Sequence, residues 1–146
     1  MMQTDTAPRT TRPLNILLIE DDDNHAALVE RVFRSMQPPA TLTRMCDGAD
    51  ALRHLTSRRQ RPDLILLDLK LPGLSGHDVI AQLKADPTLR AIPVVVLTTS
   101  DTQRDRQQAL SNHANSYLVK PLDFERFKEM LNTLVAYWGR WNIRLH

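Results

Sequence analysis

The chain of 146 residues can form one domain with a single buried core, and its 42% apolar and 25% charged residues are typical of globular proteins. A net charge of +2 gives no reason to expect a nucleic-acid partner. The four glycines form no dinucleotide-binding G-x-G-x-x-G pattern, and a single cysteine excludes an internal disulfide. No apolar run approaches the ~20 residues that span a bilayer, and the polar N-terminus lacks a signal peptide, so we expect a cytoplasmic protein without a membrane partner.

Short apolar runs alternate with helical periodicities after an N-terminal tail, residues 1–12, that we expect to be mobile. The predicted strands are residues 14–19, 40–46, 64–67, 92–97 and 116–119, and the predicted helices are residues 24–36, 49–57, 76–85, 101–112 and 123–138. Asp23 or Asn24 is expected to cap the first helix, and Ser75 the third. Cys46 ends an alternating segment and is expected to be an inert core thiol.

Five alternations of strand and helix predict a parallel sheet with helices on both faces. By analogy, the flavodoxin-like, doubly wound strand order 2-1-3-4-5 fits this number of units. We therefore expect an α/β sandwich of the (βα)5 type in residues 13–138, with residues 40–46 at one edge of the sheet.

Acidic side chains follow two of the predicted strands, at the edge where open α/β sheets bind ligands. Glu20, Asp21 and Asp22 follow the first strand, and Asp68 follows the third. Because these strands are neighbours in the order 2-1-3-4-5, their carboxylates converge and repel one another unless a cation lies among them. Such oxygen ligands suit Mg²⁺ and, less selectively, Mn²⁺ or Ca²⁺. A solvated acidic loop and a merely structural buried aspartate are the alternatives.

With a metal beside it, Asp68 can act as a nucleophile toward a phosphoryl donor and form an aspartyl phosphate. Lys120, which follows the fifth strand, can supply positive charge to the phosphoryl oxygens, and Thr98 can donate a hydroxyl hydrogen bond. Taken alone, Thr98 is explained equally well as a hydroxyl that satisfies the backbone, and Tyr117 as a plain strand aromatic.

Several motifs, in their order and spacing, resemble the receiver domain of bacterial two-component response regulators. They are Glu20-Asp21, Asp68 with Leu71-Pro72 and Gly76, Thr98-Thr99, and Tyr117-Leu118-Val119-Lys120-Pro121. The resemblance covers about residues 14–138. Residues 17–21 and 92–100 and the final aromatic helix are also similar to stand-alone regulators that pair with bacterial phytochromes.

The resemblance implies that Asp68 is the phospho-acceptor and that Mg²⁺ binds beside it. Asp21 would bind the metal directly, Glu20 largely through water, and the backbone carbonyl of Lys70 would be a third protein ligand. The cationic side chain of Lys70 stands where the family's residues influence dephosphorylation. Asp22 falls one place beyond the usual acidic pair and is expected to be a spectator.

The resemblance also implies a switch. Thr98 would follow the phosphoryl group, Lys120 would form a salt bridge with it, and Tyr117 would turn inward when Thr98 moves. The donor histidine would belong to a sensor histidine kinase. The five histidines of this chain show no ligand spacing, and we expect all of them to be surface residues.

Only residues 139–146 follow the last helix, so we expect the output to be protein–protein contact rather than an attached output domain. This end of the chain is more apolar than a free terminus should be, through Trp138, Trp141, Ile143 and Leu145. It either folds back onto the domain or grips a second subunit. We expect a homodimer formed through the fourth helix, the fifth strand, the last helix and this tail.

Two other function classes compete with a phosphorylated switch. A degenerate receiver would be a constitutive interaction module, but the intact Asp68, Asp21 and Lys120 disfavour it. A haloacid-dehalogenase-like phosphatase also uses a strand-end aspartate nucleophile. It needs a second aspartate two residues later as general acid, and Lys70 occupies that position.

Overall fold

The computed structural model describes residues 13–36, 40–57 and 61–143, where strands and helices alternate as predicted and the predicted boundaries agree within two residues. The strands are β1 (Asn15–Ile19), β2 (Thr41–Met45), β3 (Leu64–Leu67), β4 (Val94–Thr98) and β5 (Ser116–Val119). The helices are α1 (Asp23–Arg34), α2 (Gly48–Ser57), α3 (Gly76–Ala85), α4 (Gln103–Ser111) and α5 (Phe124–Ala136), followed by the π-helical η1 (Tyr137–Trp141). The predicted N-terminal tail and Leu145 lie outside the described residues.

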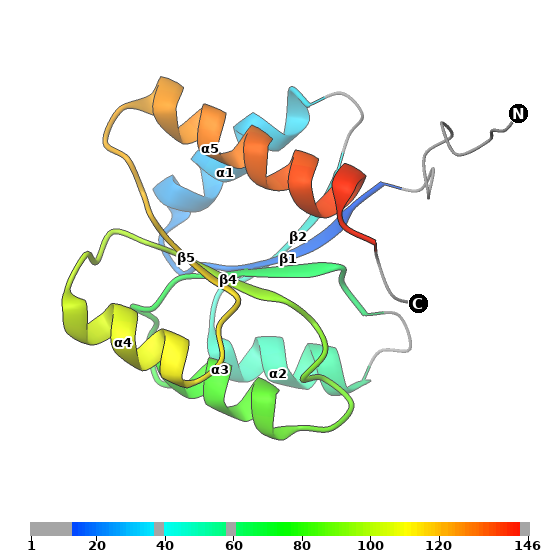
Figure 1. The fold of residues 1–146 in the computed structure, drawn as a ribbon, viewed down its shortest axis with the longest axis vertical. Helices are drawn as coiled ribbons and strands as arrows, with labels where there is room; N and C mark the ends of the chain where they lie inside the picture. Colours follow the sequence, from blue (N-terminus) through cyan, green and yellow to red (C-terminus); the bar gives the residue numbers. More distant parts are fainter. Residues whose placement is uncertain (1–12, 37–39, 58–60, 144–146) are drawn as a thin grey trace, which may run out of the picture.

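The five strands form one parallel sheet in the order β2-β1-β3-β4-β5, which confirms the predicted flavodoxin-like fold. Every residue of β3 is buried, as expected for the centre of a doubly wound sheet. The edge strand β2 exposes Thr41 and Thr43, and its other residues are half-buried. Figure 1 shows α1 and α5 on one face of the sheet and α2, α3 and α4 on the other.

Because side chains alternate along a strand, each strand contributes to a core on both faces. Ile65 and Leu67 pack with Ile80 of α3 in the core under α2, α3 and α4. Leu66 packs with Phe127 of α5 in the core under α1 and α5. Burial on both faces holds the carboxyl ends of β1 and β3 in register, so that the residues after them are fixed in space.

Polar side chains cap the N-termini of α1 and α3, and the cap predicted for α1 is wrong. Ser75 caps α3 in a reciprocal capping box with Asp78, as predicted for the Ser75 cap. The cap of α1 is Asp22, whose Oδ1 accepts from the backbone N–H groups of Asn24 and His25 at 2.8 and 3.1 Å. The prediction of Asp23 or Asn24 was wrong, because several adjacent acidic and amide side chains can all cap a helix and the spacing does not choose among them.

Two further details differ from expectation. Cys46 is exposed rather than buried, because it follows the last residue of the edge strand β2, where the chain leaves the sheet. Helix α5 ends at Ala136 and continues as a π-helical turn closed by a hydrogen bond from the Asn142 N–H to the Tyr137 carbonyl, at 2.7 Å. The helical segment therefore extends past Trp138, into the predicted tail. Among the described helices, none has the length and apolar content needed to cross a membrane.

Candidate functional site

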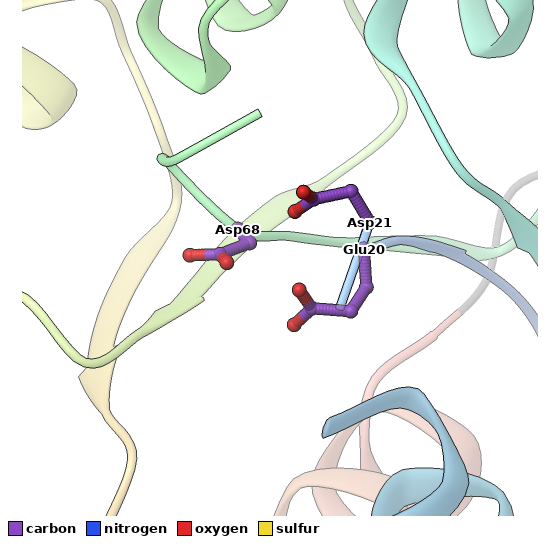
Figure 2. A group of neighbouring side chains, drawn as sticks. All are labelled: Glu20, Asp21 and Asp68. Atoms are coloured by element: carbon purple, nitrogen blue, oxygen red, sulfur yellow. The ribbon is translucent and has the colours of Figure 1, made fainter. Parts of the chain in front are cut away.

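Three carboxylates meet at the carboxyl ends of β1 and β3. Ile19 pairs with Leu67 in the sheet, so Glu20 and Asp68, the next residues, lie on neighbouring strand ends, with Asp21 beside them. One oxygen from each of Glu20, Asp21 and Asp68 lies within 4.8 Å of the others. Figure 2 shows the carboxylates of Glu20 and Asp21 extending from the end of β1 toward Asp68. The arrangement matches the predicted convergence of acids.

The carboxylates differ in burial and in partners. Glu20 is buried, and its Oε1 accepts a hydrogen bond from Lys120 Nζ at 2.7 Å. Burial raises the pKa of the Glu20 carboxyl, and the Lys120 ammonium partly offsets this effect. Lys120 Nζ is 3.9 Å from Asp68 Oδ2, while Asp68 Oδ1 is buried without a hydrogen-bond partner among the described residues. An orphaned buried carboxylate oxygen next to two other acids suits a hard divalent cation.

Strands β4 and β5 also place Thr98 and Lys120 at this edge of the sheet. The Lys120 backbone N–H donates to the Thr98 carbonyl at 2.7 Å, continuing the β4–β5 pairing one residue past the last paired residues. The Thr98 side chain is fully buried and its Oγ1 accepts from the Ser100 N–H at 3.3 Å. Lys70 is exposed in the loop after Asp68. A metal contact from its carbonyl stays a prediction, as do the switch roles of Thr98 and Tyr117.

A polar network, not anticipated from the sequence, links α3, α4 and β5 beside Thr98. Asp105 of α4 accepts from Ser100 Oγ at 2.5 Å and pairs with Nε2 of His77, in α3, at 3.0 Å. The Tyr117 hydroxyl donates to the Ser100 carbonyl at 2.9 Å, and burial raises the pKa of the Tyr117 phenol. Tyr117, Ser100, Asp105 and His77 therefore form one connected chain of contacts.

The side chain of Asp105 should stabilise the fold in a pH-dependent way. Hydrogen bonds from Ser100 and His77 lower the pKa of the Asp105 carboxyl below its ordinary value of 3.8. A lowered native pKa gives stability that is present above the unfolded value and lost as pH falls through the native one. We expect Asp105→Ala to reduce the free energy of unfolding by about 1–2 kcal/mol at pH 7 and by less below pH 4, in urea titrations. Asp101→Ala, at an exposed carboxylate, is the control and should change little.

Two of the histidines contact side chains of other elements, which corrects the expectation that all five are surface residues. The side chain of His77 is 12% exposed and its Nδ1 is buried. The ring of His25 is 36% exposed, and its Nδ1 lies 3.0 Å from Lys120 Nζ. Both contacts join residues from different elements, so no local spacing signals them. His146 lies outside the described residues.

The apolar residues near the C-terminus are placed in different environments. Trp138 is half-buried and packs against the core under α1 and α5. Trp141 and Ile143 are 71% and 62% exposed. An open groove of about 910 Å³ lies between β5 and α5, with walls that include Leu118, Met130 and Trp138.

The doubly wound sheet, with acids after β1 and β3 and a lysine after β5, defines a flavodoxin-like domain with a candidate divalent-cation site. The model of the response regulator receiver domain matches residues 16–132, and the chain belongs to this family. Receiver domains are signalling switches of two-component systems.

Three relatives illustrate the likeness. The protein named probable methanogenesis regulatory protein FilR2, from Methanothrix harundinacea, is 45% identical over 134 residues, which cover 89% of this chain and 86% of that protein. The crystal structure of the phosphorylated cyanobacterial phytochrome response regulator RcpA superposes with a TM-score of 0.87 at 31% identity, over 92% of this chain and all of that one. The Mn²⁺-bound form of Rcp1, a response regulator of Synechocystis, gives 0.84 at 34% identity, with the same coverage of both chains.

Proposed function

We propose that this protein is a phosphoryl-accepting switch, in which Asp68 takes a phosphoryl group from a sensor histidine kinase in the cytoplasm. The observation that carries the proposal is Asp68 itself. One of its oxygens is buried without a partner, two acids lie beside it, and the Lys120 ammonium is 3.9 Å from the other oxygen. Membership of the receiver family supports it, because receiver domains take phosphoryl groups from histidine kinases.

In the proposed reaction, an oxygen of the Asp68 carboxylate attacks the phosphorus of the donor. A new P–O bond forms, and the P–N bond of phosphohistidine breaks, with its electron pair leaving on the imidazole nitrogen. Glu20, Asp21 and Asp68, with the Lys70 carbonyl, would hold Mg²⁺, or Mn²⁺ or Ca²⁺ in its place, and the metal would neutralise charge on the phosphoryl oxygens. Lys120 would pair with a phosphoryl oxygen and Thr98 would donate to another.

Intact mass after incubation with acetyl phosphate and Mg²⁺ tests this proposal. We expect one phosphoryl mass gain that disappears in Asp68→Asn and when Mg²⁺ is removed. Asp101→Asn, a change of an exposed carboxylate outside the cluster, should keep the gain. Beryllofluoride binding is measured in parallel, because rapid hydrolysis of the aspartyl phosphate would hide the mass gain. Wild-type protein that neither gains mass nor binds beryllofluoride would favour the alternative, a phosphorylation-independent interaction module.

The donor kinase is proposed to be a bacteriophytochrome. The support is the likeness to RcpA and Rcp1, of which RcpA is named as a phytochrome response regulator. The identity to FilR2 makes a kinase with another input the competing choice. Phosphotransfer from a purified bacteriophytochrome kinase, faster than from an unrelated sensor kinase at equal concentrations, would support the pairing; equal or slower transfer would contradict it.

We further propose a homodimer through α4, β5, α5 and the C-terminal residues. Exposed apolar side chains gather on these elements, among them Leu110, Tyr137, Trp141 and Ile143. The groove beside β5 and α5 offers a surface into which apolar side chains of a second copy could pack. We call residues 139–146 the C-terminal arm, and Leu145 is assigned to it from the sequence alone.

Making the C-terminal arm polar should weaken the proposed dimer. We expect Trp141→Ser with Ile143→Ser to raise the dimer dissociation constant at least tenfold, because both side chains are largely exposed in the single chain and would be buried in the dimer. Sedimentation velocity over a concentration series measures the change. Leu28→Ser, at an exposed leucine of α1, is the matched control. An unchanged dissociation constant in the arm variant would contradict the proposed interface.

A further inference from the structure

The environment of the Lys120 ammonium contains one group that the proposed reaction does not use. Its Nζ lies 2.7 Å from Glu20 Oε1 and 3.0 Å from His25 Nδ1. A lysine ammonium has three N–H donors and no acceptor, so both partners must accept. His25 Nδ1 is therefore the acceptor in this contact, which leaves the ring N–H on Nε2. The distance of 3.9 Å between His25 Nδ1 and Glu20 Oε1 is that of two acceptors sharing one donor group, not of a hydrogen bond.

Local structure holds His25 in this place. Asp22 caps α1, and its Oδ1 accepts from the His25 backbone N–H at 3.1 Å, which fixes the first turn of the helix over the carboxylate cluster. Asp22, predicted as a spectator, thus sets the backbone position of His25. The side chain of Lys120 is only 6% exposed, so water can replace little of what the imidazole supplies.

We propose that His25 is a positioning residue for Lys120. Hydrogen bonds to Glu20 and His25 occupy two of the three ammonium protons and prevent rotation about the Cε–Nζ bond. The third N–H is then left for an oxygen of a phosphoryl group on Asp68, whose Oδ2 is 3.9 Å away. With Glu20 as the only partner, the ammonium could rotate, and ordering it would be part of the barrier to phosphoryl transfer. This inference rests on the proposed function.

Two substitutions at His25 distinguish loss of the hydrogen-bond acceptor from loss of the shape of the side chain. Asparagine places Oδ1 two bonds from Cβ, as histidine places Nδ1, whereas leucine places a methyl group there. We expect His25→Leu to slow phosphorylation by acetyl phosphate about tenfold, the lower end of the range for one lost hydrogen bond to a charged group, and to weaken beryllofluoride binding similarly. His25→Asn should stay within about twofold of wild type. Equal phosphorylation rates in His25→Leu and His25→Asn, whether or not these are below the wild-type rate, would overturn the positioning role.

A second measurement does not depend on phosphorylation. Long-range ¹H–¹⁵N NMR at pH 8.5, where imidazoles are neutral, reports the tautomer of each histidine. We expect the Nε2–H tautomer for His25 in wild type and a shift toward a mixture in Lys120→Met. A proton on Nδ1 in wild type would overturn the inference even if Asp68 is phosphorylated. Wild-type protein that takes no phosphoryl group would instead overturn the proposed function, and the tautomer would still decide whether the contact exists.

Discussion

Gly76→Ala should lower the free energy of unfolding by about 3 kcal/mol and disrupt the loop that carries Asp68. Gly76 is the first residue of α3, and its N–H donates to the Leu69 carbonyl at 2.9 Å. A Cβ on Gly76 would lie 2.5 Å from both the Asp68 carbonyl oxygen and the Leu69 Cα. Backbone atoms cannot rotate away as a side chain can, so either the helix or the loop after β3 must move.

Urea unfolding and beryllofluoride binding measure the two parts of this effect. Because the displaced loop includes Asp68, we expect the folded fraction of Gly76→Ala to bind beryllofluoride at least tenfold more weakly than wild type. Gly139→Ala is the matched control, since its added methyl group would meet the Leu14 side chain no closer than 3.4 Å, an ordinary contact. Gly76→Ala with wild-type stability would mean that α3 can shift without cost, contrary to the close approach of Gly76 to the backbone of Asp68 and Leu69.

The parts of the fold that could be predicted are those set by local pattern and by sheet geometry. The apolar run of β3 ends in Asp68, and β1 ends before Glu20, so parallel pairing alone brings these acids together. The same logic places Lys120 and Thr98 at this edge. Gly76 entered the prediction only through a family motif, and the structure supplies its physical reason, the close approach of α3 to the backbone after Asp68.

The parts that could not be predicted depend on how the helices are rotated against one another. His77 meets Asp105 across 28 residues and His25 meets Lys120 across 95, and no spacing in either helix signals a partner in another element. The cap of α1 was ambiguous because Asp22 stands among other side chains that can cap. Cys46 was misplaced because alternation along an edge strand does not reveal where the chain leaves the sheet.

Lys120→Met should strongly slow phosphoryl acceptance and destabilise the protein at neutral pH, and the two losses have different causes. The Glu20 side chain is 2% exposed and pairs with Lys120 at 2.7 Å, so the substitution leaves a buried carboxylate without its charge partner. We expect a loss of about 3 kcal/mol in the free energy of unfolding without divalent metal. Acetyl phosphate should modify the variant about a hundredfold more slowly, because positive charge is lost where the phosphoryl oxygens would lie.

Cation binding and a double variant separate these causes. Lys120 is a positive group 2.7 Å from Glu20 and 3.9 Å from Asp68, and it opposes a cation held by the same acids, so Lys120→Met should bind Mg²⁺ more tightly than wild type in calorimetric titrations. Adding Glu20→Gln should restore most of the lost stability, since a neutral amide leaves no buried charge unpaired, yet should not restore phosphorylation. If the double variant regained phosphorylation, the role of Lys120 would be only to neutralise Glu20. If stability alone returned and the double variant was still about a hundredfold slower than Glu20→Gln, which shares its altered metal cluster, the ammonium acts on the phosphoryl group itself.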